Sequence, residues 1–219
     1  MTLLLPDMHD PLPVSQPDNL ESLIQCENEI SWNNFFGNAH PVEIEVGCGK
    51  GKFIIRSALE HPETNYLGIE RSGKFFRIMQ QRAFNSGVQN IKLLNTDADY
   101  FIRNYIPEGS VQAYHIYFPD PWPKQRHHKR RLINAGFMEA IKSSLASSGC
   151  IFFATDFTDY FTVMVTVARA CSGLEEVFNT SILPAGANPE DAATSYERKY
   201  LLQGRVIYKA AYRKIIHES

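Results

Sequence analysis

Short apolar runs alternate with longer amphipathic segments along most of this chain. Runs of about four to eight apolar or β-branched residues favour buried strands, and they lie at 42–46, 66–69, 91–94, 111–118, 150–154, 174–179 and 205–212. Segments with helical spacing lie at 50–60, 72–85 and 134–145. Because strands that alternate with helices form a mainly parallel sheet covered on both faces, the pattern predicts an α/β fold with a seven-stranded, mostly parallel sheet.

Residues 157–171 carry two opposing signals. Their β-branched side chains, among them Thr162, Val163 and Val165, favour a strand by propensity. The apolar positions recur at helical spacing, however, and the segment is longer than a typical strand. We therefore expect a helix in this segment.

The first 35 residues differ in composition from the rest. They contain four prolines and, up to residue 30, six acidic side chains with no Lys or Arg. We expect this acidic lead, residues 1–35, to form a loop and one short helix. Residues 36–219 show no internal repeat and no second apolar core, so we expect a single domain there.

The charges of the chain are unevenly distributed. There are 22 Lys and Arg against 24 Asp and Glu, which gives a net charge of −2. Residues 124–131 (KQRHHKRR), which we call the basic strip, nevertheless contain five Lys or Arg, two His and no acid. Because local clustering sets the field at a surface, the overall acidity does not exclude a nucleic-acid partner.

Composition argues against several classes of protein. No stretch approaches 18 apolar residues and the N-terminus lacks the basic region of a signal peptide, so we expect neither a membrane span nor secretion. The four cysteines, Cys26, Cys48, Cys150 and Cys171, form no C-x-x-C pair, which is typical of reduced thiols in a cytoplasmic protein. The paired histidines of the basic strip lack the Cys or carboxylate neighbours that zinc requires, so no metal is expected.

The first strand runs into a glycine-rich turn. Residues 45–51 have the sequence EVGCGKG. In open α/β sheets ligands bind beyond the carboxyl ends of strands, and glycines there let the backbone approach a ligand closely. A dinucleotide fingerprint requires glycine at position 52, where Lys52 stands. The spacing G-x-G-x-G with a preceding acid instead matches the first motif of class I methyltransferases that use S-adenosylmethionine, and it predicts their Rossmann-like fold.

Further carboxylates follow the next two strands. Glu70 ends the second strand, where a carboxylate can accept hydrogen bonds from both hydroxyls of a ribose. Asp97 follows the third strand, where it can accept from an adenine amino group. Glu45 can contact a cationic methionine portion, directly or through water. Each carboxylate alone is better explained as a surface acid or a cap, but the three together, at the ends of three successive strands, predict a cofactor site.

A loop with three prolines follows the fourth strand. Residues 118–124 have the sequence FPDPWPK. Proline fixes φ and restricts its predecessor, so the loop presents Asp120 and Trp122 in a stiff frame. The functional interpretation is a pocket for an extruded base, with Asp120 accepting from the base edge and Trp122 either stacking on the base or bracing the loop. The alternative is a structural connection with Trp122 in the core.

The ordered motifs resemble those of one family. The sequence DPWPKQRHHKRR at 120–131 is similar to the signature of bacterial tRNA (guanine-N7-)-methyltransferases, and TSYERK at 194–199 is similar to their T-x-Y-E motif. With the glycine turn and the GIE of residues 68–70, the resemblance covers about residues 40–215. The acidic lead does not align with the family, and Tyr200 stands where the family has Phe.

The resemblance implies a reaction and a set of residue roles. In the implied reaction the methyl donor is S-adenosylmethionine, and the product is 7-methylguanosine at position 46 of the tRNA variable loop. The implied enzyme is cytoplasmic and is a monomer or homodimer. Cofactor contacts fall on Glu45, Gly47, Gly49, Glu70, Asp97 and Asp120, and Asp120 is the catalytic residue. Guanine and tRNA contacts fall on Lys124, Asp156, Thr194, Tyr196 and Glu197. RNA contacts fall on Arg126, His127, His128, Lys129, Arg130 and Arg131.

The chemistry of guanine limits what the protein must supply. N7 carries a lone pair and no proton, so it attacks a sulfonium methyl group without a strong base, and catalysis rests mainly on positioning. Asp120 can stabilise the positive charge that the purine gains, or orient the cofactor or the base edge. Asp156, which ends the fifth strand, can bind the guanine N1–H and amino group, or can instead cap the following helix.

Three alternatives fit parts of the sequence. Another S-adenosylmethionine enzyme, acting on a small molecule or a protein, explains the glycine turn but leaves the basic strip unexplained. A tRNA-binding protein that has kept the fold and lost catalysis would not bind the cofactor. A nicotinamide-dependent dehydrogenase is disfavoured by Lys52 at the third glycine position.

Overall fold

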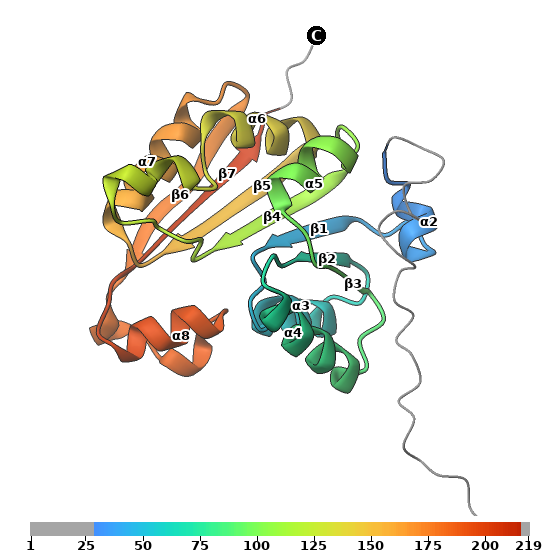
Figure 1. Ribbon diagram of the computed structural model, residues 1–219, viewed down its shortest axis with the longest axis horizontal. Helices are drawn as coiled ribbons and strands as arrows, with labels where there is room; N and C mark the ends of the chain where they lie inside the picture. Colours follow the sequence, from blue (N-terminus) through green and yellow to red (C-terminus); the bar gives the residue numbers. More distant parts are fainter. Residues whose placement is uncertain (1–28, 216–219) are drawn as a thin grey trace, which may run out of the picture.

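A sheet of seven strands organises the protein (Figure 1). The computed structural model describes residues 29–215. The strands are β1 (Val42–Val46), β2 (Asn65–Ile69), β3 (Ile91–Leu94), β4 (Val111–Tyr117), β5 (Leu145–Thr155), β6 (Leu174–Ile182) and β7 (Ile207–Lys214). The helices are α2 (Trp32–Phe36), α3 (Lys52–Glu60), α4 (Gly73–Ser86), α5 (Ala98–Tyr105), α6 (Ala135–Ser144), α7 (Thr158–Ala170) and α8 (Ser195–Leu202). Short 3-10 turns are η1 (Gln125–Arg130), η2 (Pro184–Gly186) and η3 (Pro189–Asp191).

The strand order is β3-β2-β1-β4-β5-β7-β6. Neighbouring strands from β3 to β5 pair in parallel, whereas β7 is antiparallel to both β5 and β6. The expected seven-stranded, mostly parallel sheet is confirmed. Because the order reverses between β1 and β4, the connections after these strands diverge and leave a crevice at their carboxyl ends.

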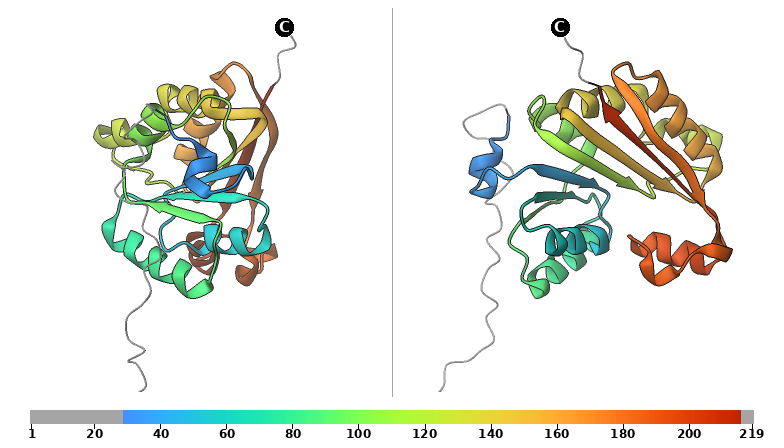
Figure 2. Two further views of the ribbon diagram at one scale, coloured as in Figure 1. Left: turned by 90° about the vertical axis from the view of Figure 1, so that its right-hand side faces the viewer. Right: turned by 180° about the vertical axis from the view of Figure 1, so that it is seen from behind.

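Helices cover both faces of the sheet (Figures 1 and 2). Helices α5, α6 and α7 pack on one face, and their side chains form the largest apolar cluster with β1, β4 and β5. Helices α3 and α4 lie on the other face, around a smaller cluster that includes Ile54 and Met79. Helix α8 lies on this second side as well, beyond β7 (Figure 1).

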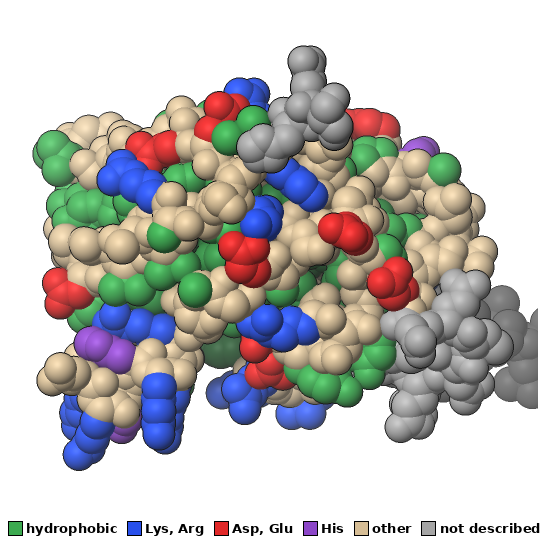
Figure 3. All heavy atoms as spheres, turned by 90° about the horizontal axis from the view of Figure 1, so that it is seen from above, with side chains coloured by type: hydrophobic (Ala, Val, Ile, Leu, Met, Phe, Trp, Pro, Cys, Tyr) green, Lys and Arg blue, Asp and Glu red, His purple; other side chains and the backbone are tan. Residues whose placement is uncertain are grey.

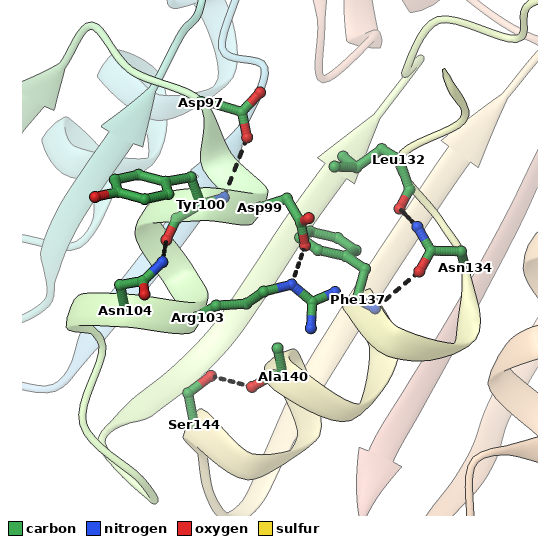
Figure 4. A network of polar contacts seen from close by, with 10 residues as sticks. All are labelled: Asp97, Asp99, Tyr100, Arg103, Asn104, Leu132, Asn134, Phe137, Ala140 and Ser144. Carbon is green, nitrogen blue, oxygen red and sulfur yellow. Dashed lines mark hydrogen bonds and ion pairs between the residues drawn. The ribbon is translucent and has the colours of Figure 1, made fainter. Parts of the chain in front are cut away.

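Local signals in the sequence explain most helix boundaries. The Ser72 side chain accepts a hydrogen bond from the Phe75 N–H, and Gly87 ends α4 in the left-handed region with φ +71°. The Asn134 side chain starts α6 by accepting from the Phe137 N–H (Figure 4). The helix expected at 157–171 is confirmed as α7, because its apolar positions are buried at helical spacing.

Helices α5 and α8 were not predicted from the apolar pattern. Helix α5 is amphipathic, but it spans only eight residues and buries only Phe101 and Ile102, so its apolar pattern is short. The helix begins at Asp97, whose Oδ1 accepts from the Tyr100 N–H at 3.1 Å (Figure 4). Helix α8 likewise buries little apolar surface and begins at a capping residue, Thr194. Strand β5 also starts five residues earlier than the apolar run at 150–154.

The described part of the acidic lead contains the short helix α2, and residues 1–28 lie outside the described residues. The Trp32 Nε1 donates to the Ser110 Oγ at 2.9 Å, which fastens α2 to the start of β4. Within residues 29–215, no helix combines the length and apolar character needed to cross a bilayer, and no three metal-binding side chains come together. The described cysteines, Cys48, Cys150 and Cys171, are free thiols.

Candidate functional site

The glycine turn connects β1 to α3 at the crevice. Gly47 and Gly51 have φ of +77° and +74°, in the left-handed region that side chains disfavour. A Cβ on Gly51 would also meet the Met79 Cγ at 2.7 Å, so α4 packs directly on the turn. A Cβ on Gly47 meets nothing within 4 Å, which leaves the backbone open to a ligand on that side.

Glu70 organises this turn from the end of β2. Its Oε2 accepts from the Gly49 N–H at 2.8 Å, and its Oε1 accepts from the Ser72 N–H at 2.7 Å. The carboxylate therefore fixes both the glycine turn and the start of α4. Each carboxylate oxygen can accept a further hydrogen bond, so this arrangement leaves acceptor capacity toward a ribose.

Glu45 is a buried carboxyl group at the end of β1. Its residue is 3% exposed, and its Oε2 has no hydrogen-bond partner among the described residues. Burial, with a smaller contribution from the nearby Glu70 carboxylate, raises the pKa of Glu45 to about 8. An unpartnered carboxyl oxygen is costly in the interior, and a cationic ligand group would satisfy it.

Two adjoining cavities surround the turn. The smaller, of about 250 Å³, is lined by Glu45 and by side chains from α3 and α8. The larger, of about 940 Å³, is lined by Glu70, Asp97, Asp120 and part of the basic strip. The two cavities share the lining residues Gly47, Phe75, Tyr117 and Tyr196. Glu45 thus lines the smaller cavity, and Glu70 and Asp97 line the adjoining larger cavity together with Asp120.

Asp97 lines the larger cavity and also stabilises the start of a helix. It caps α5, and its Oδ2 lies 3.4 Å from an Arg71 guanidinium nitrogen. Its side chain is 47% exposed, so the carboxylate stays accessible. Asp97 therefore caps a helix, as one explanation of the sequence suggested, and also lies where a cofactor contact is expected.

The proline loop has a strained backbone on both sides of Asp120. Phe118 and Trp122 have φ of +52° and +43°, which is rare for residues other than glycine and is often found at functional sites. Asp120 is exposed and lines the larger cavity. Trp122 is half-buried and packs against the strip: the Arg130 guanidinium lies 5.0 Å from its ring, and the His127 ring 5.8 Å. Trp122 therefore lies outside the core, where it packs against the strip and also lines the larger cavity.

Most of the basic strip is exposed. Lys124 precedes η1, and this turn carries Arg126, the two histidines, Lys129 and Arg130. Figure 3 shows Lys, Arg and His side chains gathered on one projecting part of the surface. Arg131 differs: its residue is 7% exposed, its Nε donates to the Pro121 carbonyl at 2.8 Å, and its guanidinium lies over the Tyr160 ring. Arg131 therefore holds the strip against the proline loop.

The T-x-Y-E segment forms the start of α8. The Thr194 hydroxyl accepts from the Glu197 N–H at 2.9 Å, and the Glu197 carboxylate accepts from the Ala193 N–H at 3.1 Å. This is a variant of the capping box, because Glu197 binds the N–H of Ala193, one residue before the N-cap Thr194, and it uses the Thr and Glu side chains of the motif. Glu197 is 4% exposed and also pairs with Lys209 at 2.6 Å. Tyr196 points elsewhere: its ring lies over the glycine turn, where its Cε2 would be 3.5 Å from a Cβ on Gly49.

Asp156 follows β5 and does not cap α7. The Phe157 N–H is bound by the Thr155 hydroxyl instead, and the Asp156 Oδ2 pairs with the Arg205 Nη1 at 2.6 Å. Sequence reasoning did not identify Arg205 as part of the site. It also passed over Lys52, whose ammonium group donates to the Ala192 carbonyl at 2.7 Å and so ties α3 to the segment before α8. Nothing in the spacing of the sequence shows these contacts, because each joins residues far apart in the chain.

Comparisons with known proteins agree with this geometry. A family model described as a putative methyltransferase matches residues 39–210. The tRNA (guanine-N(7)-)-methyltransferase of Geobacter metallireducens is 39% identical over 193 residues, which cover 87% of this chain and 90% of that protein. The enzyme of the same name from Streptococcus equi subsp. zooepidemicus is 36% identical over 179 residues, covering 81% and 83%.

The chain belongs to the tRNA (guanine-N(7)-)-methyltransferase family. The expected family resemblance is therefore confirmed. Solved methyltransferase structures share its fold at low sequence identity. The 16S rRNA (adenine(1408)-N(1))-methyltransferase from Catenulisporales acidiphilia, solved with S-adenosylmethionine, has a TM-score of 0.60 at 13% identity, covering 88% of this chain and 96% of that one. The 16S rRNA methyltransferase KamB has a TM-score of 0.61 at 11% identity, covering 84% and 92%.

Within the tRNA (guanine-N(7)-)-methyltransferase family, this chain joins the elements of its motifs at one place. The glycine turn, the proline loop and the start of α8 lie far apart in the sequence, yet all three line the hollow at the β1/β4 crevice. Such a site fits a methyltransferase that must hold a nucleoside-like cofactor and a nucleic-acid base side by side.

Proposed function

We propose that this protein transfers the methyl group of S-adenosylmethionine to N7 of the guanine at position 46 in the tRNA variable loop. The observation that carries the proposal is the lining of the larger cavity. Carboxylates suited to a nucleoside cofactor, Glu70 and Asp97, line it together with Asp120 and with Lys129 and Arg130 of the basic strip. A cofactor pocket and a cationic RNA-facing surface therefore meet at one hollow.

The residues around the glycine turn fit the cofactor. The unpartnered Oε2 of Glu45 matches the ammonium of its methionine portion, and the open backbone at Gly47 leaves room for it. Glu70 is placed to accept from the ribose hydroxyls and Asp97 from the adenine amino group, while Gly49 lines the same wall. The cofactor supplies a methyl group on a positively charged sulfur, which is a good electrophile for a neutral nitrogen.

The protein's own contribution is positioning and charge. Asp120 sits in a loop that contains three prolines and packs through Trp122 on the basic strip, so the backbone that carries its carboxylate is restricted before the substrate binds. Guanine gains positive charge as N7 forms its new bond, and a fixed carboxylate nearby stabilises that charge. No proton must leave N7, so the chain needs no general base there.

Side chains beyond Asp120 would hold the guanine. Asp156 lines neither cavity and is paired with Arg205, and its carboxylate offers acceptors to the N1–H and the 2-amino group. Tyr196 offers a ring that lines both cavities. Lys124 starts the turn that carries the basic strip and is exposed toward tRNA. Thr194 and Glu197 act through the capping box, by fixing the start of α8 and hence the Tyr196 ring.

The basic strip would supply affinity by contacting phosphates. Arg126, His127, His128, Lys129 and Arg130 are available for this. Arg131 supports the strip from beneath through Pro121. Each phosphate contact by Lys or Arg steepens the log–log salt dependence of binding by about 0.7–0.9.

We further propose a single methyltransferase domain over residues 36–219, acting in the cytoplasm as a monomer or homodimer and without a metal. The reaction described above asks for no Lewis acid, because the sulfonium activates its own methyl group. We assign the enzyme to the cytoplasm because its proposed substrate, tRNA, is found there.

The test is methyl transfer from labelled S-adenosylmethionine to tRNA that lacks this modification, followed by nucleoside analysis. Label in 7-methylguanosine is the expected result. A matched transcript with adenosine in place of guanosine at position 46 should accept no label. Label in another nucleoside would overturn the N7 assignment, and full labelling of the adenosine transcript would overturn position 46.

A further inference from the structure

Asp156 is already paired with a cation in the tRNA-free structure. Its side chain is 11% exposed, and its Oδ2 accepts from the Arg205 Nη1 at 2.6 Å. Among residues 29–215, Arg205 is the only recorded hydrogen-bond partner of this carboxylate. The acceptor that the proposed function assigns to guanine is thus filled by a side chain of the protein itself.

The Arg205 guanidinium also stacks on an aromatic cluster. Its central carbon lies 4.8 Å from the Tyr200 ring centroid. Tyr200 in turn stacks near Tyr196, with centroids 6.2 Å apart and planes at 28°, and packs on Phe118 at 5.5 Å. Rings of this kind are the surfaces on which an unstacked base is held.

The two contacts of Arg205 are those that a guanine would make. The N1–H and 2-amino group of guanine, joined through C2, present the same planar pair of N–H donors as a guanidinium. Both a guanine edge and an arginine can therefore donate to one carboxylate while a flat face rests on tyrosine. The Arg205 guanidinium imitates the substrate in its donors and in its stacking.

The main chain of Arg205 is anchored, but its side chain is free enough to leave Asp156. It follows Gly204, which has φ +71°, and its backbone N–H donates to the Tyr200 carbonyl at 3.0 Å, so the main chain is anchored. Its side chain is 52% exposed, and the described residues give it no side-chain hydrogen bond beyond Asp156. An ion pair with one half-exposed partner is weak, and water can take the guanidinium in exchange.

We propose that Arg205 is a positioning residue that guards Asp156: its guanidinium occupies the guanine subsite in the free enzyme, and the target guanine must displace it. The inference rests on the proposed function, because it takes Asp156 as the guanine acceptor. In the free enzyme Arg205 keeps the Asp156 carboxylate paired and oriented. Entry of guanine releases the guanidinium to solvent.

The first test compares Arg205→Ala with Arg213→Ala in the full-length protein. Arg213 is a matched control, since it lies in β7, the strand that follows Arg205, is 50% exposed and pairs with Glu175 at 2.6 Å. Both changes remove one positive charge. Relative to Arg213→Ala, the Arg205→Ala enzyme should show a KM for tRNA lowered roughly two- to fivefold at unchanged kcat, the size of effect that one weak ion pair can supply. Equal KM values for the two variants would overturn the proposal.

The second test adds guanidinium chloride at millimolar, non-denaturing concentration, against potassium chloride at equal ionic strength. Free guanidinium should inhibit Arg205→Ala competitively with tRNA, and more strongly than it inhibits the wild type. If Arg205 were required to hold Asp156 for the reaction, the variant would lose turnover and guanidinium would restore it. Restoration of activity would therefore overturn the displacement model.

Asp156→Asn separates this inference from the proposed function. The variant should lose activity while it still binds S-adenosylmethionine. Normal activity in Asp156→Asn would overturn both the guanine role of Asp156 and the guarding role of Arg205. A wild-type enzyme that makes 7-methylguanosine while Arg205→Ala behaves like the control would overturn the guarding role alone.

Discussion

Because the carboxyl group of Glu45 is buried, we expect it to influence both the pH dependence of the stability of the protein and the binding of the cofactor. Folding raises its pKa from the ordinary value of 4.5 to about 8, chiefly because burial disfavours the charged form. Between these values the folded protein holds a proton that the unfolded chain releases. The stabilisation from this group is therefore complete below pH 4.5, falls as the pH rises toward 8, and is lost above it.

The magnitude follows from the same two values. The slope is about 1.4 kcal/mol per pH unit, which amounts to on the order of 5 kcal/mol between pH 4.5 and 8. Glu45→Gln keeps the shape of the side chain and removes the titration. The variant should therefore gain stability relative to the wild type as the pH rises through this window, while its affinity for S-adenosylmethionine falls.

Denaturant unfolding of both proteins from pH 5 to 9 measures this difference. Glu63→Gln, at a side chain 68% exposed, removes the same charge from the surface and serves as the control. Calorimetry in buffers of different ionisation enthalpy should also show close to one proton released when the wild type binds the cofactor at pH 7, and none with Glu45→Gln. Parallel stability curves for Glu45→Gln and the wild type would refute the reasoning.

Three further results are expected from single substitutions. Asp120→Asn should lower kcat on the order of 100-fold, since a fixed charge is lost, while tRNA affinity in a filter-binding assay stays within twofold. Arg130→Ala should flatten the log–log salt slope of tRNA binding by about 0.7–0.9, whereas Arg131→Ala should leave the slope unchanged and lower the melting temperature; the reverse pattern would show that Arg131 meets phosphate. Gly51→Ala should destabilise the fold by about 1–3 kcal/mol in denaturant titration, because φ is +74° there and the new Cβ would meet the Met79 Cγ.

Much of the architecture could be predicted because it depends on local pattern. Apolar runs placed the seven strands, and helical spacing decided α7 against its β-branched composition. Helices α5 and α8 were missed because each is short, begins at a capping side chain (Asp97 or Thr194) and has no long apolar stripe. A short polar helix is stable only through the neighbours that the fold supplies.

The sequence predicted the place of the candidate site because the order of the first three strands could be predicted. Once β1, β2 and β3 are parallel neighbours, the acids at their ends must meet at one edge, as Glu45, Glu70 and Asp97 do. What each side chain does there depends on its partners. Thr194 and Glu197, expected to touch the substrate, are used in a capping box.

The sequence by itself determined the residue types, the glycine turn, the stiff proline loop and the concentration of positive charge after it. Only the tertiary structure decided which of these charges remain free. It buried Arg131 beneath the proline loop and joined Arg205 to Asp156 across 49 positions of the chain. Pairing and burial are set by contacts between distant segments, and such contacts have no period or spacing along the sequence from which they can be read.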